Sequence, residues 1–338
     1  MTKAQSILKL RELQKELPPF IAGFFRGLSD YTSDSTRLGY AYDLKIFFTY
    51  LSEEVIHKEI RNFTAEDLAF ITATDIEGFM DYLTYYLKRE VAVQNEALGK
   101  SRKLAAVRTM FKYFYGKGQI PANPAELVGF PKLRQKAITT LEINEVAMLL
   151  DQVESGEKLT EKQQQYHERT KIRDVAIVTM LLGTGMRVSE CVGLNLQDID
   201  FDTGGAKVTR KGGDEMILYF GSEVEEALQA YLSWREGVEV KEGHETALFL
   251  SMQNRRITDR AVQNLVKKYA SLVTTLKNIS PHKLRSTFGT QLYKETGDIY
   301  LVANVLGHSD VNTTRKHYAK MDDSQRRKAA NAVKLRND

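Results

Sequence analysis

Apolar residues recur at helical spacing along most of the chain. Three series before residue 131 place apolar side chains three or four residues apart, which predicts helices that each bury one face. Their apolar positions are Leu44, Phe47, Phe48 and Leu51, then Ile76, Phe79, Met80, Leu83 and Leu87, and then Leu104, Val107, Met110, Phe111 and Phe114. The first part of the chain is therefore predicted to be an all-helical domain.

The helical periodicity breaks near the middle of the chain. Pro121, Pro124 and Pro131 cluster there, and each proline disfavours helical conformation at the residue before it. The segment 131–139 carries no apolar period, so we expect an extended linker. This predicts a helical domain over 1–130, a basic linker over 131–139 and a second domain over 140–338.

The second domain combines helices with one β region. Val146 and Leu149 belong to a further helical series, and the charged stretch 154–171 is interpreted as a surface insertion. Residues 206–210 and 215–220 flank a Lys-Gly-Gly-Asp turn that is typical of a β-hairpin. We therefore expect a mainly α fold whose second domain holds a small antiparallel sheet, with Lys211 projecting from the hairpin turn.

Composition narrows the class of protein. The chain has 338 residues, and its one cysteine, Cys191, cannot form an internal disulfide. No run of about 18 apolar residues predicts a membrane span. A cytoplasmic protein without a membrane partner is expected. The 48 basic and 44 acidic residues give a net charge of only +4, which does not by itself indicate nucleic acid.

The distribution of charge is more informative than its sum. Residues 97–125 hold six basic residues and no acidic one, and the linker continues this bias. A basic helix joined to a basic linker can follow a phosphate backbone, while a solvated helix face is an equally weighted alternative. Under the first interpretation the DNA contacts are Lys100, Arg102, Lys103, Arg108, Lys112, Lys132 and Arg134.

Two segments of the second domain carry arginines in patterns suited to chemistry. A glycine turn at Gly185 delivers Arg187 to a predicted helix start, and Glu190 lies three residues further on, where it can orient a basic group. His282 and Arg285 are also three residues apart, directly after a proline suited to a first helical turn. Arginine forks can hold phosphate oxygens in pairs, which a lysine cannot do.

The carboxyl-terminal part of the chain adds a histidine and a tyrosine. Gly307 is predicted to cap a helix directly before His308, and Tyr318 follows in a strongly basic stretch. A metal site built on His282, His308 and His317 lacks carboxylate or cysteine ligands at suitable spacing, so no metal is predicted. A surface tyrosine is the more frequent role for any single residue of this kind.

Taken together, these residues follow a recognisable order. An arginine after a glycine turn, a hairpin lysine, a His-x-x-Arg pair, Leu-Gly-His and a tyrosine succeed one another along about 200 residues. The order resembles that of the tyrosine recombinase (phage integrase) family, and its motifs are most similar to those of single-recombinase Xer-type proteins. The matching positions are Arg187, Lys211, His282, Arg285, His308 and Tyr318.

The resemblance implies a site-specific DNA recombinase that needs no cofactor. Tyr318 would attack a phosphodiester to form a 3′-phosphotyrosine, between guanidiniums of Arg187 and Arg285 that stabilise the developing charge. Lys211 would protonate the departing 5′-oxygen, and His282 would accept the phenol proton. His308 would donate a hydrogen bond to the phosphate, with Glu190 in support.

The resemblance also implies partners and an assembly. The expected partner is a double-stranded DNA recombination site, and a homotetramer would exchange strands on paired sites through a Holliday junction. Protomers would be monomeric or weakly associated when free. The basic segment 326–336 is either a helix exchanged between neighbours or a solvated tail.

Several functional alternatives remain open. A type IB topoisomerase uses similar tyrosine chemistry without pairing of sites, and a DNA-binding module with a lapsed active site would keep the fold alone. For a recombinase, chromosome dimer resolution and mobile-element integration or excision employ the same chemistry. Base contacts and DNA shape set the recognised sequence, which these motifs do not specify.

Overall fold

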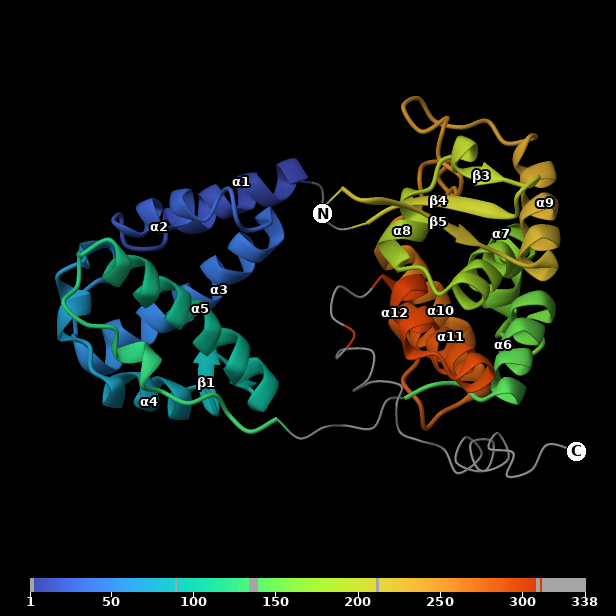
Figure 1. The fold of residues 1–338 in the computed structure, drawn as a ribbon. Coiled ribbons are helices and arrows are strands. Elements are labelled where there is room, and N and C mark those ends of the chain that lie inside the picture. The colour runs from blue at the N-terminus through green and yellow to red at the C-terminus, as the bar shows by residue number, and fades with distance from the viewer. Residues whose placement is uncertain (1–2, 89, 134–138, 211–212, 308–310, 312–338) are drawn as a thin grey trace, which may run out of the picture. The chain divides into compact units, whose positions relative to one another are not determined.

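The structure, a computed structural model, describes residues 3–88, 90–133, 139–210, 213–307 and 311 (Figure 1). The chain divides into two units, residues 1–136 and 137–338. The division lies inside the segment predicted as a linker. The mainly helical fold with small antiparallel sheets is confirmed.

The first unit consists of helices and one hairpin. Its elements are α1 (Lys3–Gln14), α2 (Ile21–Gly27), α3 (Asp34–Tyr50), α4 (Ala73–Tyr82), β1 (Tyr85–Lys88), β2 (Val91–Gln94) and α5 (Ala97–Gly116). Helix α3 continues into a π-helical turn, Leu51–Val55. The longer connection from there to α4 contains the 3-10 turns Ile60–Asn62 and Asp67–Phe70, and a third, Pro124–Glu126, follows α5.

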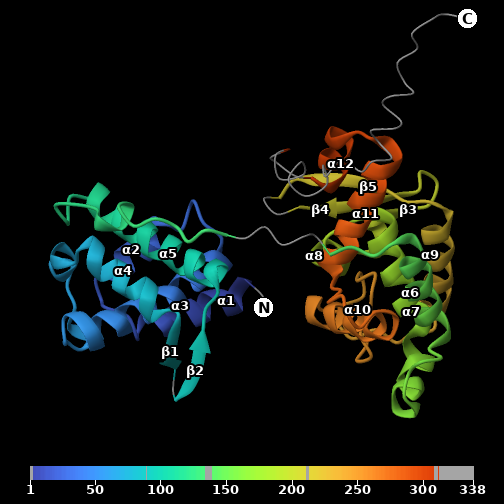
Figure 2. The same cartoon turned by 90° about the horizontal axis from the view of Figure 1, so that it is seen from below.

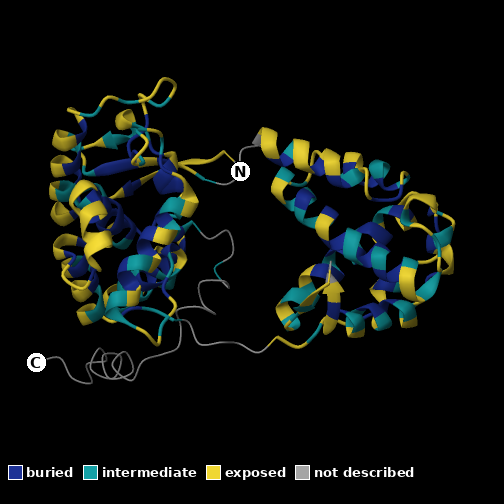
Figure 3. Ribbon diagram, turned by 180° about the vertical axis from the view of Figure 1, so that it is seen from behind, coloured by how far each residue is buried: buried dark blue, intermediate teal, exposed yellow. Residues whose placement is uncertain are grey.

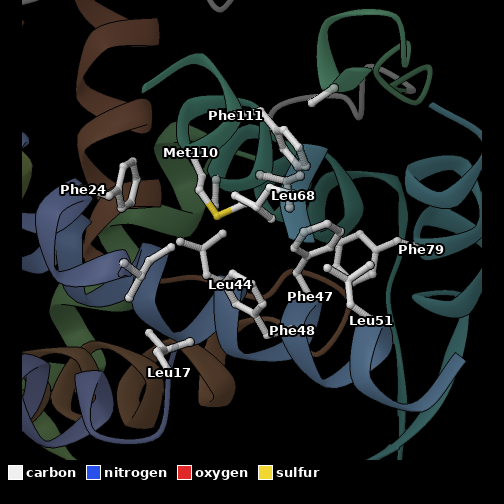
Figure 4. Packing of buried hydrophobic residues seen from close by; sticks show 14 of the residues in the cluster. Leu17, Phe24, Leu44, Phe47, Phe48, Leu51, Leu68, Phe79, Met110 and Phe111 are labelled. Carbon is white, nitrogen blue, oxygen red and sulfur yellow. The ribbon is translucent and has the colours of Figure 1, made fainter. Parts of the chain in front are cut away.

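Aromatic and aliphatic side chains together fill the core of the first unit, as Figure 4 shows. The ring of Phe47 on α3 lies 5.0 Å from that of Phe79 on α4 and 6.2 Å from that of Phe111 on α5, edge to face in both pairs. Such pairs add about 0.5–1.5 kcal/mol to the burial of their area. The apolar faces predicted for these three helices therefore form one core.

The first unit is not all helical, which corrects one expectation. Helix α4 ends at Tyr82, and Leu87, predicted to continue its apolar face, lies 61% exposed in β1. Leu87 pairs with Ala92 across an antiparallel hairpin. The spacing from Leu83 fits a helix, but two tyrosines and the Val-Ala-Val of β2 favour strands, and the local cross-strand pairing prevails.

The second unit places helices around a three-stranded sheet. Its elements are α6 (Ile143–Ser155), α7 (Glu161–Thr184), α8 (Val188–Gly193), β3 (Ile199–Asp200), β4 (Gly205–Thr209), β5 (Glu215–Tyr219), α9 (Ser222–Arg235), α10 (Asp259–Val273), α11 (Pro281–Thr296) and α12 (Ile299–Leu306). The sheet order is β3-β4-β5, antiparallel throughout. Helix α7 contacts α6, α9 and α11 and is the centre of the helical layer (Figure 2).

The charged stretch 154–171 is not an insertion, contrary to expectation. Most of it belongs to α7, where the Thr160 hydroxyl accepts a hydrogen bond from the Gln163 amide. Its first turns are exposed, but His167 is buried and its Nδ1 lies 2.9 Å from the Tyr269 hydroxyl. Glu, Lys and Gln favour helix, so a capped polar sequence extends a buried helix into solvent.

The predicted hairpin is confirmed in β4 and β5, whose register pairs Thr209 with Glu215. Residues 211 and 212 lie outside the described part, so the projection of Lys211 stays a prediction. Figure 3 shows that each unit has its own buried interior and largely exposed outer helix faces. None of the described helices has the length and apolar character needed to cross a bilayer.

Candidate active site

A glycine turn between α7 and α8 sets the direction of Arg187. Gly185 caps α7 with a φ of +64°, in the left-handed region that glycine tolerates best. A Cβ atom at Gly185 would lie 2.3 Å from Cδ1 of Phe288 on α11. Both constraints demand glycine, and the chain can then start α8 directly after Arg187.

Arg187 and Glu190 form the pair that their spacing predicts. Nη1 of Arg187 donates to Oε1 of Glu190 at 2.7 Å, and the Arg187 amide donates to Oε2 at 2.7 Å. The Glu190 side chain is buried, whereas that of Arg187 is 36% exposed. The carboxylate therefore holds the arginine by both backbone and side chain, while part of the Arg187 side chain stays exposed.

Arg285 is the buried arginine of the site. It lies one turn inside α11, 4% exposed, and its Nη1 donates to the Gly185 carbonyl at 2.7 Å. Its Nη2 donates to the Leu306 carbonyl. His282 stands exposed in the first turn of the same helix, and Pro281 starts that turn as predicted. Arg285 therefore ties the glycine turn to the end of α12.

Three arginines converge on the carboxyl end of α12. Arg210, Arg285 and Arg187 donate from Nη2 to the successive carbonyls of Val305, Leu306 and Gly307 respectively. The last carbonyls of a helix have no partner within it and carry partial negative charge, which cations stabilise. Three segments distant in sequence are thereby brought to one point of the fold.

The end of α12, where the three arginines meet, directly precedes His308 in the chain. Gly307 caps α12 with a φ of +59°, which confirms the predicted glycine cap, and His308 is the next residue. Lys211, His308 and Tyr318 lie outside the described residues. The described site thus contains Arg187, Glu190, His282 and Arg285, and their assignment to catalysis remains a prediction.

Sequence reasoning did not assign Arg210 to the site. Its guanidinium packs on Gly307, where an added Cβ would lie 0.9 Å from Nη1. Burial lowers the pKa of Arg210, while the nearby Glu190 carboxylate opposes that shift. Arg210 stands next to Lys211 in the chain, and this adjacency was the available signal.

Two basic residues of the first unit, Lys103 and Arg102, lie close to a buried carboxylate, and only Arg102 is exposed. Lys103 is only 6% exposed, and its Nζ donates to Oδ1 of Asn95 at 2.7 Å, so it does not lie on an exposed stripe as predicted. Nη2 of Arg102 bonds to Oδ1 of buried Asp43 at 2.7 Å. Burial raises the pKa of Asp43, an effect that Arg102 and Lys103 oppose. Both cations therefore compensate an internal carboxylate.

The other basic residues differ in exposure, with Lys100 and Arg108 half-buried. Lys112 and Lys132 are exposed, Lys100 donates to the Thr84 hydroxyl, and the Arg108 guanidinium lies 4.9 Å from the ring centre of Phe130. Arg134 lies outside the described residues. A DNA surface on this unit would therefore rest on the following residues: Lys100, Arg102, Arg108, Lys112 and Lys132.

Cys191 lies next to the site but is unsuited to nucleophilic chemistry. It is completely buried in α8, and burial raises the pKa of its thiol to about 12, with a further contribution from the Asp259 charge. A raised pKa keeps the thiol protonated throughout the neutral range, and the thiolate is the nucleophile of cysteine chemistry.

Cys191 should therefore resist alkylation in the folded protein. We expect N-ethylmaleimide at pH 7.5 to leave native protein unmodified and to leave covalent DNA capture intact, whereas urea-unfolded protein should react fully. Mass spectrometry measures the modified fraction. Rapid labelling of the native chain would show that the thiol is accessible and would contradict the burial.

Among the described residues, no group of three or more His, Cys, Asp or Glu side chains is arranged to hold a metal ion. The chemistry that this site can perform rests on fixed cationic donors. Arg285, which is buried, and Arg187, which is partly exposed, are suited to bind a phosphodiester and to stabilise the negative charge that develops on it during attack.

Comparison with known proteins assigns the family. Residues 140–325 match the model of the phage integrase family. Tyrosine recombinase XerC of Thermodesulfovibrio yellowstonii is 36% identical over 218 residues, which cover 64% of this chain and 69% of that protein. Tyrosine recombinase XerC of Caldanaerobacter subterraneus subsp. tengcongensis is 33% identical and covers 93% of this chain and 86% of its own length.

Solved structures share the fold. The post-cleavage complex of the XerH site-specific recombinase with a palindromic difH substrate aligns with a TM-score of 0.66 at 20% identity, over 89% of this chain and 80% of that one. The Tn1549 transposon integrase in complex with circular intermediate DNA aligns with a TM-score of 0.66 at 19% identity, over 92% and 98%. With the family match and the XerC relatives, these findings show that the chain belongs to the phage integrase family and is a site-specific tyrosine recombinase.

Proposed function

We propose that this recombinase breaks and rejoins double-stranded DNA through a covalent bond between Tyr318 and a 3′-phosphate. The observation that carries the proposal is the meeting of Arg187 and Arg285 at the end of α12. Tyr318 follows that point by eleven residues in the chain, counted from Gly307. The order of motifs identifies Tyr318 as the nucleophile. Arg187 and Arg285, together called the arginine clamp, supply the positive charge that stabilises the transition state.

The clamp acts on the non-bridging phosphate oxygens. A guanidinium carries five N–H donors in one plane, so it can bind protein carbonyls along one edge and phosphate oxygens along another. Arg285 is fixed by two carbonyls, and Arg187 is fixed by Glu190 and one carbonyl. Donors held in place before the reaction stabilise the transition state without reorganisation during it.

Proton transfers complete the cleavage step. The Tyr318 oxygen forms a bond to phosphorus as its proton passes to His282, and the phosphorus–O5′ bond breaks as Lys211 protonates the departing oxygen. His308 donates a hydrogen bond to the phosphate. A 5′-hydroxyl of the partner strand reverses these steps, so the phosphodiester energy is conserved and ATP is not required.

The reaction requires an assembly on DNA. We place four copies on two paired sites, since exchange of strands between duplexes needs a nucleophile for each of the four strands. Free protomers are monomeric or weakly associated, and the segment 326–336, outside the described residues, is the proposed exchanged element. The reaction takes place in the cytoplasm, on nucleoid DNA.

We rank chromosome-type recombination ahead of mobile-element transfer, because the motifs resemble those of Xer-type proteins and the two relatives are tyrosine recombinases named XerC. Capture of covalent adducts on sheared genomic DNA of the source organism, followed by sequencing, distinguishes the two. One site opposite the replication origin supports chromosome dimer resolution. Sites at the ends of an integrated element would instead assign the protein to integration and excision.

Two other activities of the same fold are separated by simple assays. A type IB topoisomerase relaxes supercoiled plasmids without any site, whereas this chain should act only on a plasmid that carries the captured sequence. A lapsed DNA-binding module would bind that sequence without forming an adduct. A nicked suicide duplex of the captured sequence traps the adduct and decides the question.

Cleavage should not depend on a divalent metal. We expect adduct formation in excess EDTA to proceed at the rate seen in buffer, since Arg187 and Arg285 supply the cationic charge that a metal provides in other phosphoryl-transfer sites. The measurement is the initial rate on the suicide duplex before and after chelation. A loss that added Mg²⁺ or Zn²⁺ restores would support the metallohydrolase alternative.

The exposed basic residues of the first unit should determine the salt dependence of binding. Lys112→Gln should weaken DNA binding and reduce the slope of log K against log salt concentration by about 0.9, because one phosphate contact is lost. Titration at several salt concentrations measures the slope. Lys9→Gln on α1 is the matched control, and equal slopes for Lys112→Gln and the unaltered protein would assign Lys112 to a merely solvated face.

A further inference from the structure

Arg210 links two segments that are far apart in the sequence. Its backbone closes the β4–β5 hairpin, since its amide donates to the Asp214 carbonyl at 2.7 Å and its carbonyl accepts from the Gly213 amide at 3.0 Å. Its side chain leaves the hairpin, and Nη2 donates to the Val305 carbonyl of α12 at 2.9 Å. Arg210 thus connects the hairpin to α12.

The contact with α12 is close and specific. The guanidinium occupies the space in which any side chain at residue 307 would begin, because a Cβ there would lie 1.9 Å from Cζ of Arg210. The Nε atom of Arg210 is buried without a hydrogen-bond acceptor among the described residues. A buried donor without an acceptor lowers stability, so it offsets part of what the hydrogen bond to Val305 contributes.

The two ends of this contact adjoin two proposed catalytic residues. Arg210 directly precedes Lys211, and Gly307 directly precedes His308. Consecutive Cα atoms are about 3.8 Å apart across a trans peptide bond, so an anchored residue restricts the position of the next one. Arg187 donates to the Gly307 carbonyl at the same point. Among the described residues, the Arg210 side chain therefore connects the β4–β5 hairpin to the end of α12, where the arginine clamp also binds.

We propose that Arg210 is a positioning residue for strand cleavage, which holds the hairpin against the end of α12 and so aligns Lys211 with the departing 5′-oxygen. The inference rests on the proposed role of Lys211 as the proton donor. It predicts that loss of Arg210 impairs proton donation rather than phosphate binding. The residue acts through Lys211 and does not need to touch DNA.

A sulfur-substituted substrate separates proton donation from the other steps. In a nicked suicide duplex of the captured sequence, a 5′-bridging sulfur replaces the scissile 5′-oxygen. A thiolate is a far weaker base than an alkoxide, so it departs without a proton. A variant that lacks only proton donation is therefore slow on the oxygen duplex and fast on the sulfur duplex.

We expect Arg210→Met to cleave the oxygen duplex about 10²-fold more slowly than the unaltered protein and to recover to within about threefold on the sulfur duplex. Lys211→Met should behave in the same way. Arg187→Lys should be slow on both duplexes, since its defect lies in the clamp. Lys207→Met is the matched control, because Lys207 lies on the same hairpin, pairs with Glu215 on the surface and should cleave both duplexes normally.

The outcomes distinguish the inference from the proposed function. If Lys211→Met recovers on sulfur and Arg210→Met does not, the positioning role is wrong. Unchanged cleavage of the oxygen duplex by Arg210→Met would also overturn it. If Lys211→Met itself fails to recover, Lys211 is not the proton donor and the inference falls with that assignment. Arg210→Lys, which keeps the charge and one donor, should show a smaller defect with the same recovery, and it replaces Arg210→Met if that variant does not fold.

Discussion

Replacement of Tyr318 by phenylalanine should abolish the covalent protein–DNA adduct and leave DNA binding intact. The change removes one hydroxyl, so the side chain keeps its shape while the nucleophilic oxygen is lost. Loss of a nucleophile typically lowers the rate by about 10⁴-fold or more. Adduct formation on the suicide duplex, measured by denaturing gel electrophoresis, reports the chemistry, and a mobility shift at the same protein concentration reports the binding.

A second tyrosine provides the control for this result. Tyr300 is exposed on α12, in the same unit, and Tyr300→Phe removes an equivalent hydroxyl. We expect it to form the adduct at the normal rate. Continued adduct formation by Tyr318→Phe would identify a different nucleophile, and loss of adduct together with loss of binding would indicate a structural role instead.

Replacement of Arg285 by lysine should slow cleavage about 10²- to 10³-fold, the loss typical when a fixed donor to the transition state is removed. The positive charge remains, but a single ammonium cannot reproduce a planar fork that spans the Gly185 and Leu306 carbonyls. DNA binding should change little, since the net charge is unaltered. Single-turnover cleavage rates on the suicide duplex measure the effect.

Stability must be separated from catalysis here, because Arg285 is buried. Its replacement leaves a buried carbonyl unsatisfied, which costs about 1–3 kcal/mol of unfolding free energy. Arg256→Lys is a matched control, since Nη1 of Arg256 binds the Val192, Gly193 and Leu194 carbonyls at the end of α8. That variant should lose comparable stability yet cleave normally once folded. Equal cleavage defects in both variants would mean that the loss at Arg285 reflects folding alone.

The local part of the site could be predicted from the sequence because helix geometry fixes it. Arg187 and Glu190 are three residues apart at a helix start, and that spacing alone brings them into contact. The glycine cap at Gly307 follows from the same kind of local rule. The engagement of Arg210 with α12 could not be predicted, because it joins residues 95 positions apart and depends on how the sheet packs on the helices.

In α5 the helical period and the local charge predict different environments for one residue. Lys103 shares a helical face with Val107, Met110 and Phe114, so the same period that predicts the core also places Lys103 on the buried side. Charge alone assigned it to the DNA surface. The hairpin of β1 and β2 could not be predicted from apolar spacing, because Leu83 and Leu87 fit a helix while the neighbouring residues favour strands.

The most direct test of the central claim is the identity of the residue that carries the DNA. Protein trapped on the suicide duplex is digested with nuclease and trypsin, and the nucleotide-bearing peptide is sequenced by mass spectrometry. We predict that a 3′-linked nucleotide is attached to Tyr318, within the tryptic peptide 317–320. A nucleotide on any other residue, or one joined through its 5′-phosphate, would contradict the account.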